Sequence, residues 1–187
     1  MKTSFKIHAG LQLGLGGVAL LASALTLLPG RPLVTHTGLF LAVCFALLVP
    51  LHAGTIFRSI ALHLRSGSRV SDKALQWQAL RNLPRPVHVF LIGAGVAAAA
   101  LLASTGSGDR LSGAEAAQGR YTAVDTTDPR RERVTISRTA YDRLHKEDQR
   151  SMFTVFGLLA VGGGAFTLTV AELDASGRSR TPDGSAL

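Results

Sequence analysis

Charged residues are missing from four long stretches of this sequence. The stretches 9–28, 37–57, 87–108 and 151–171 contain no Asp, Glu, Lys or Arg, and each is about 20 residues long. The helices of a soluble domain need a polar face, so an absence on this scale excludes an ordinary soluble fold. At a rise of about 1.5 Å per residue, each stretch as a helix spans the roughly 30 Å hydrocarbon layer of a bilayer. We therefore predict an all-α membrane protein built as a bundle of four transmembrane helices.

The sequence also lacks a second cysteine and any acidic residue within the predicted spans, which limits the chemistry that the protein can perform. Cys44 is the single cysteine, so an intrachain disulfide is excluded, and we expect it to be a small packing residue inside the second stretch. No acidic residue lies inside a predicted span, and the first span offers only Gln12 where an ion-coupled carrier would place a carboxylate. The sequence therefore disfavours ion-coupled transport but is compatible with the function of an uncoupled pore.

The charged residues gather in particular connections. The segment 1–8 carries two lysines and no acid, and the connection 58–86 carries six basic residues against one acidic residue. The connection 29–36 has one arginine, and in 109–150 the two signs nearly balance. Because positively charged loops stay in the cytoplasm, we predict a protein of the bacterial cytoplasmic membrane. Both termini and the connection 58–86 are expected on its cytoplasmic side. The net charge of +8 then reflects topology and anionic lipid headgroups, and no nucleic-acid partner is expected.

The first stretch has an alternative interpretation as a signal peptide. Lysines precede it and Ala22-Ser23-Ala24 resembles a cleavage site. The apolar run continues to Leu28, which favours an uncleaved helix.

The basic connection is expected to contain a short amphipathic helix over 71–83. Ser71 is a suitable cap, Asp72 suits the first turn, and Pro84 ends the helix. Trp77 and Leu83 belong to a broad apolar arc that either lies on the inner membrane surface or packs on the bundle.

Small residues recur at helical spacing in three of the spans. The residues concerned are Gly10, Gly14 and Gly17 in the first span, Gly93 and Ala97 in the third, and Ala160 and Gly164 in the fourth. Such faces let helices approach closely, so we expect packing within the bundle or between two copies of the chain.

The outer connection 109–150 is expected to form a small cap. The segments 120–124 and 133–137 have the alternation of two strands joined by a turn, which predicts a β-hairpin. A helical pattern then runs without a breaker from about Thr139 to Ala171. The remaining segment 172–187 is expected to be a disordered cytoplasmic tail.

These features together resemble a known architecture. Val49-Pro50-Leu51-His52 in the second span, Val134-Thr135-Ile136-Ser137 with Tyr141, and a helix through Arg150 follow one another in order. The segment 38–165 is similar to small bacterial four-span integral membrane proteins of uncharacterised function that carry an extracytoplasmic hairpin between spans three and four. The resemblance implies this architecture and no activity.

Histidines are the remaining candidates for chemistry within the membrane. His52 and His88 are expected near the inner ends of adjacent spans, where two imidazoles could ligate the iron of a haem b or another metal. Alternatively, His52 hydrogen-bonds within the bundle, because Pro50 deprives the Ala46 carbonyl of its helical donor. No diagnostic metal motif is present, so no cofactor is expected, with haem b as the alternative.

The sequence thus favours a non-enzymatic membrane protein of the interaction type. Its cap would bind a partner, which could be an envelope component, a membrane subunit or a toxin, through Arg130, Arg131, Tyr141 and His145. The alternatives are a homo-oligomeric uncoupled transporter or pore subunit and a haem-bearing electron carrier.

Overall fold

The computed structural model of the chain is mostly helical and carries one small sheet. It describes residues 3–30, 32–34, 37–66, 73–105, 111–117, 119–127 and 130–178. Four of its helices are long and apolar enough to cross a membrane: α1 (Thr3–Leu25), α2 (Thr37–Ser66), α4 (Arg85–Ala103) and α5 (Arg138–Arg178). Each uncharged stretch lies largely within one of these helices, which confirms the number and order of apolar helices.

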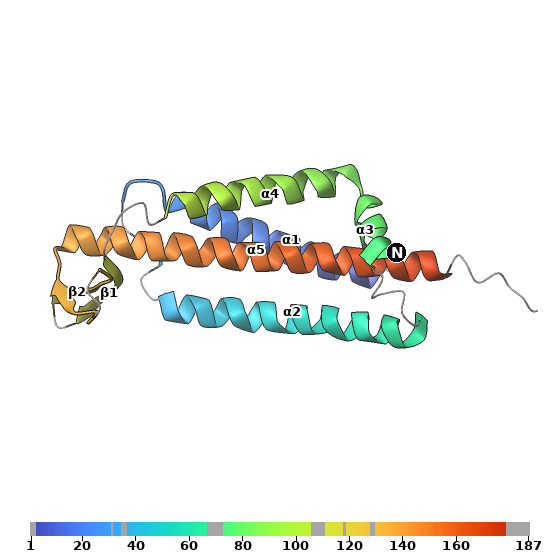
Figure 1. Ribbon diagram of the computed structural model, residues 1–187, viewed down its shortest axis with the longest axis horizontal. Coiled ribbons are helices and arrows are strands. Elements are labelled where there is room, and N and C mark those ends of the chain that lie inside the picture. The colour runs from blue at the N-terminus through green and yellow to red at the C-terminus, as the bar shows by residue number, and fades with distance from the viewer. Residues whose placement is uncertain are drawn as a thin grey trace, which may run out of the picture.

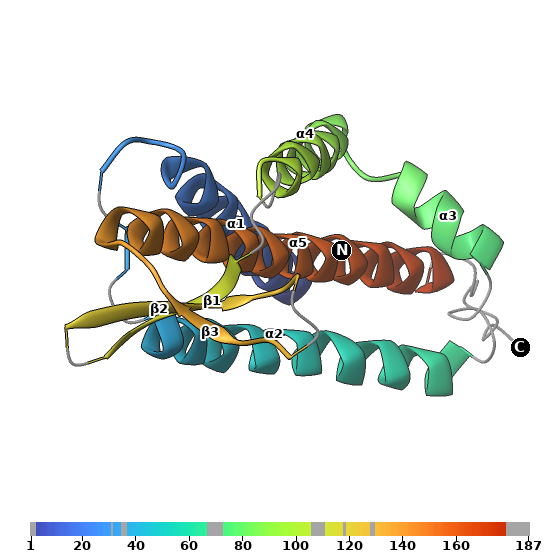
Figure 2. The ribbon, with the colours of Figure 1, turned by 60° about the vertical axis from the view of Figure 1, so that its left-hand side comes forward.

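Helix α5 is the central element. Its 41 residues correspond to about 60 Å at the helical rise, and it runs from one end of the molecule to the other (Figure 1). Helix α1 packs along α5, whereas α2 and α4 lie on opposite sides of it (Figure 1 and Figure 2). The helix expected from about Thr139 to Ala171 is thus confirmed. It continues to Arg178, however, so the prediction of disorder from residue 172 is wrong for 172–178, and 179–187 lie outside the described residues.

Backbone contact between α1 and α5 depends on glycines. A Cβ atom at Gly16 would lie 2.9 Å from the carbonyl oxygen of Gly157, and one at Gly157 would lie 3.2 Å from the carbonyl oxygen of Gly16. A Cβ at Gly164 would meet Leu13 Cγ at 2.7 Å. Ala160, which is fully buried, belongs to the same packed face. Only residues without a side chain, or with a very small one, allow this approach.

The glycine face expected on α1 is rotated relative to the one that packs. Cβ atoms at Gly10 and Gly14 would meet no described atom within 4 Å, and one at Gly17 would meet only the ring of Phe90, at 3.6 Å. The prediction that Gly10 and Gly14 pack within the bundle is therefore wrong for a single chain. Gly16, which no periodic motif singled out, makes the contact with α5.

The sheet has three strands instead of the two predicted. Strands β1 (Leu111–Ala117), β2 (Arg120–Asp125) and β3 (Arg133–Thr135) pair antiparallel in the order β1-β2-β3. Strand β1 was missed because Ala, Gly and Ser have low β-propensity. It also contains an irregularity next to Gly113, whose φ of +62° is a left-handed conformation that glycine adopts most readily. Strand β3 ends at Thr135, two residues earlier than expected.

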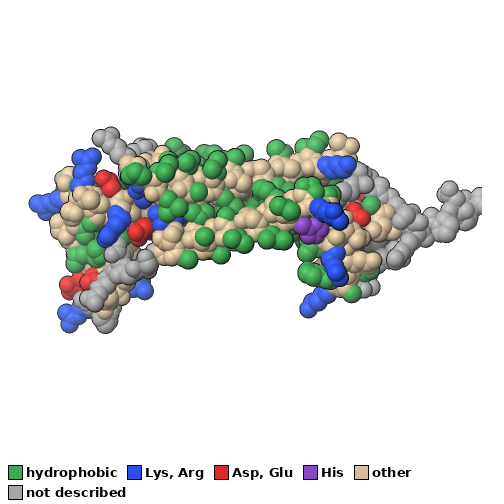
Figure 3. Space-filling view, turned by 90° about the horizontal axis from the view of Figure 1, so that it is seen from above, with side chains coloured by type: hydrophobic (Ala, Val, Ile, Leu, Met, Phe, Trp, Pro, Cys, Tyr) green, Lys and Arg blue, Asp and Glu red, His purple; other side chains and the backbone are tan. Residues whose placement is uncertain are grey.

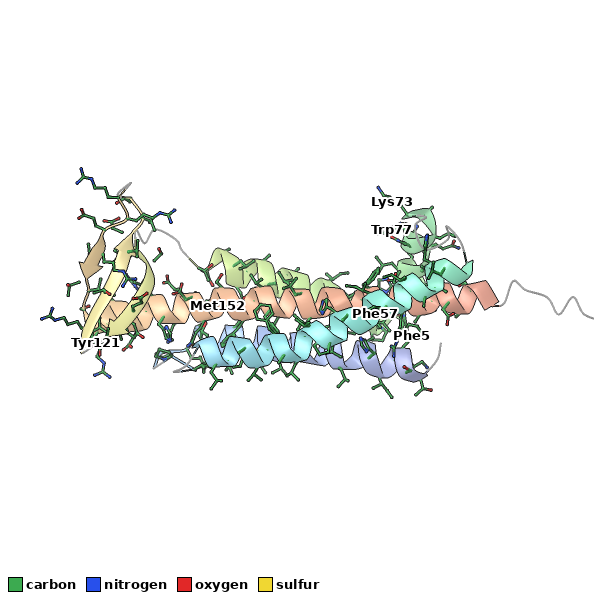
Figure 4. The ribbon with its side chains drawn as sticks, turned by 90° about the horizontal axis from the view of Figure 1, so that it is seen from below. Phe5, Phe57, Lys73, Trp77, Tyr121 and Met152 are labelled. Carbon is green, nitrogen blue, oxygen red and sulfur yellow. The ribbon has the colours of Figure 1, made fainter. Side chains whose placement is uncertain are left out.

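The short helix α3 (Lys73–Arg81) lies at the end of the molecule opposite the sheet, near the N-terminus (Figure 1). Ala79 and Leu83 are buried, whereas Trp77 is 61% exposed. Figure 4 shows Trp77 on α3. The apolar arc is thus divided between contact with the bundle and the exterior. The expected capping residues Ser71 and Asp72 lie outside the described residues.

Candidate functional site

Arg130 and Arg131 occupy the exposed turn between β2 and β3. Asp125 closes this turn, because its backbone N–H donates to the carbonyl of Glu132 at 3.0 Å. The Asp125 carboxylate also accepts from the backbone N–H and the hydroxyl of Thr127, at 2.8 and 2.6 Å. Arg131 has a φ of 50°, a left-handed conformation that is uncommon outside glycine. The described residues on either side of 128–129 thus present two adjacent, exposed arginines.

Tyr141 and His145, the other two predicted partner-binding residues, hold the sheet to α5. The ring of Tyr121 on β2 lies 4.9 Å from that of Tyr141, which stacks at 5.5 Å on the imidazole of His145. Tyr121 marks the sheet end of the molecule in Figure 4. Tyr141 and His145 are half-buried in this stack, whereas Arg130 and Arg131 are exposed, and the stack gives the two rings a positioning role.

Gln149 connects α5 to the segment between α1 and α2. Its Oε1 accepts from the backbone N–H of Leu33 at 3.1 Å, and its Nε2 donates to the carbonyl of Val34. The same Nε2 lies 3.2 Å from Nε2 of His145. A backbone N–H can only donate and a carbonyl can only accept, so the amide orientation is fixed. His145 Nε2 must therefore be the acceptor in this arrangement.

Two cations next to Gln149 strengthen this end of the bundle. Lys146 donates to the carbonyls of Leu28 and Gly30, at 2.6 and 3.3 Å. The guanidinium of Arg150 donates to the hydroxyl of Thr26 at 3.1 Å and to the carbonyl of Ser104 at 2.7 Å. Arg150 is only 8% exposed, so it joins the ends of α1 and α4 from inside the protein.

Asp148 is partly buried beside this network. Burial disfavours the charged carboxylate and raises the pKa of Asp148 above its ordinary value of 3.8, while the nearby His145 opposes the shift. The carboxylate therefore bears a desolvation cost at neutral pH.

A second polar cluster lies inside the bundle, where α1, α2 and α5 meet. The hydroxyl of Thr167 donates to Gln12 Oε1 at 2.8 Å and lies 2.7 Å from the hydroxyl of Thr55. His8 Nε2 donates to the carbonyl of Leu51 at 2.7 Å. Gln12 Nε2 is buried and has no hydrogen-bond partner among the described residues. The cluster fastens three helices together, and one amide group in it is left unsatisfied.

His52 and His88 do not meet. His52 has Nδ1 3.0 Å from the carbonyl of Leu48 and Nε2 3.2 Å from the carbonyl of Leu159 on α5. It therefore bonds within the bundle, although not to Ala46 as the position of Pro50 suggested. His88 is on α4, on the other side of α5 (Figure 1). Within the described part of the chain, no three His, Cys, Asp or Glu residues are grouped to hold a metal ion.

Polar residues inside apolar spans were the signal that could have located the inner cluster. Gln12, Thr55 and Thr167 stand out in their stretches by polarity, but the sequence does not show which helix faces they share. Gln149 and Arg150 had no such signal, since they resemble the other polar residues of a charged segment.

Comparison of the chain with protein-family models, with curated proteins and with solved structures finds no match. Any functional assignment therefore rests on the geometry of the exposed turn and the polar clusters.

Proposed function

We propose that this protein is an integral membrane protein of a bacterial cytoplasmic membrane, with four spanning helices and both termini inside. The apolar middle and the charged ends of the face in Figure 3 support this placement. The sheet and the α1–α2 connection lie at one end, and α3 and the N-terminus lie at the other, as alternating crossings require (Figure 1). The predominantly basic connection 58–86 would then lie in the cytoplasm.

We further propose a non-enzymatic role in which the outer cap binds a protein partner. The observation that carries this proposal is the turn with Arg130 and Arg131, which is exposed, closed by hydrogen bonds and mounted on a sheet fixed to α5. A loop that merely joined two helices would need neither the sheet nor its aromatic anchor. Arg130 and Arg131 place two positive charges side by side, which suits acidic side chains of a partner.

The test is capture of a partner from native membranes in a mild detergent, with the recovered proteins identified by mass spectrometry. The variant Arg130→Glu with Arg131→Glu is expected to lose a partner that the parent chain retains. Arg120→Glu with Arg138→Glu is the matched control, because it changes the net charge equally elsewhere on the exposed cap. Equal loss in both variants, or equal retention, would contradict a specific role for the turn.

The unsatisfied amide of Gln12 favours a second candidate, an uncoupled transporter or pore subunit. A homo-oligomer would then form through the open glycines of α1, and Gly14→Leu should disperse it and abolish flux. Gly164→Leu is unsuitable as a test, because Gly164 already contacts Leu13 inside the chain. Unchanged flux in Gln12→Leu and Gly14→Leu would remove this candidate.

A further inference from the structure

An apolar groove runs between α1 and α4 on the outside of the bundle. Its volume is about 520 Å³, and its lining is almost wholly apolar. Gly14 and Gly17 contribute no side chains on α1, while Pro86, Val87 and Phe90 line it on α4. A Cβ at Gly14 would meet no described atom within 4 Å, so a larger side chain at this position would project into the open space of the groove.

The groove faces the surroundings of the bundle, not its core. Val18 and Leu21, which also line it, are 66% and 61% exposed. Under the proposed membrane insertion this surface lies in the hydrocarbon layer. A volume of this size is in the range of sites that hold a small molecule, and the apolar lining offers no hydrogen bonds to a polar one.

Positive charge flanks the inner end of the groove. Along α1 the face of Gly14 continues inward through Gly10 to Lys6, each step being four residues. On α4, Arg85 directly precedes Pro86, and the helix begins there without a side-chain cap. The N-terminal end of a helix carries partial positive charge, which adds to that of Lys6 and Arg85. The described lengths of α1, α3 and α4 contain no acidic residue, whereas α5, which packs on all three, carries Glu172 and Asp174 in its last turns.

We propose that this groove is a binding site for an anionic phospholipid of the inner leaflet. One acyl chain occupies the groove, and the phosphate lies at the inner end, within reach of Lys6 and Arg85. An alkyl chain attached to a phosphate matches an apolar groove that ends in two cations, and each basic residue near the membrane surface favours anionic lipid. The proposal rests on the proposed membrane insertion but not on partner binding by the cap.

The test is native mass spectrometry of the full chain in detergent, titrated with phosphatidylglycerol or with phosphatidylcholine. The parent chain is expected to retain one phosphatidylglycerol with roughly tenfold preference. Gly14→Leu fills the groove and should abolish retention. Gly95→Leu is the matched control, since Gly95 is also open but lies on another face of α4, five residues after Phe90.

A second pair of variants separates the charge from the groove. Lys6→Gln with Arg85→Gln should reduce the preference to near parity, whereas Arg120→Gln with Arg138→Gln removes the same charge from the cap and should leave it unchanged. Retention by Gly14→Leu, or preference surviving the loss of Lys6 and Arg85, would overturn the proposal. If Gly14→Leu instead converts a dimer to a monomer, a second copy occupies the groove and the lipid site is refuted. Carbonate extraction of membranes from each variant reports insertion separately, so a failure of the membrane proposal is recognised as such.

Discussion

The amide nitrogen of Gln149 lies 3.2 Å from Nε2 of His145, and the orientation of the amide makes the imidazole the acceptor. The backbone N–H of Leu33 and the carbonyl of Val34 set this orientation, since neither group can exchange roles. The Gln149 amide thus joins His145 on α5 to the 32–34 segment.

This relationship predicts that His145 helps to hold the 32–34 segment on α5. His145→Leu removes the acceptor of the Gln149 amide, so the amide is held less firmly and we expect the hydrogen-exchange protection of Leu33 to fall severalfold. His145→Gln keeps an acceptor at this position and is the matched control, in which protection should be retained. Equal protection in His145→Leu and the parent chain would contradict this role of His145.

Asp148 should make the folded protein relatively less stable at neutral pH than at acid pH. Burial raises its pKa in the folded state above 3.8, so the folded chain binds the proton more tightly than the unfolded chain. Its contribution to stability is therefore greatest in acid and is lost as the pH rises from 3.8 through the raised pKa. Asp148→Asn is expected to raise the thermal midpoint at about pH 7, and the gain should shrink as the pH falls toward 3.8. A gain that is constant with pH would contradict a titration effect.

Gly16 and Gly10 should respond in opposite ways to the same change. Gly16→Ala places a Cβ 2.9 Å from a backbone oxygen of α5, so the helices must separate, at a cost of about 1–3 kcal/mol. Gly10→Ala adds a methyl group in open space and should gain about 0.5–1 kcal/mol from helix propensity. Thermal unfolding in one detergent measures both. A neutral Gly16→Ala would contradict the close approach of α1 and α5.

The two fully buried glutamines, Gln12 and Gln149, should differ as well. Gln149 uses both ends of its amide, and Gln149→Leu should cost about 1–3 kcal/mol because the Leu33 N–H and the Val34 carbonyl lose their partner. Gln12 has an Nε2 without a partner in the described part of the chain, and Thr167 can donate to the Gly163 carbonyl instead. Gln12→Leu is therefore expected to be neutral or stabilising. Thermal midpoints distinguish the two variants, and a severe loss in Gln12→Leu would indicate that its amide has a partner in the membrane.

Only part of the cap could be predicted from the sequence. Strand β2 and the turn after it were predictable, because β-branched and aromatic residues alternate and Asp-Pro follows. Strand β1, with the sequence LSGAEAA, has no such signal and forms through its pairing with β2. The sequence singled out Tyr141 and His145, but their spacing could not reveal that Tyr121 would pack on Tyr141. The prediction that they meet a partner remains untested, and the structure gives them a role within the chain.

The number of apolar helices, their order and the ends at which charge collects follow from the sequence alone. These properties are local, since the length of an uncharged run decides whether a helix can cross a bilayer. The rotation of each helix about its own axis is visible only in the folded structure. In the folded chain Gly16, and not Gly14, contacts α5. Gln149 bonds to a segment more than one hundred positions away, and Arg150 is buried between two helix ends. Rotation depends on the fit of facing surfaces, and many faces of an apolar helix are equally apolar, so only the packed partners distinguish them.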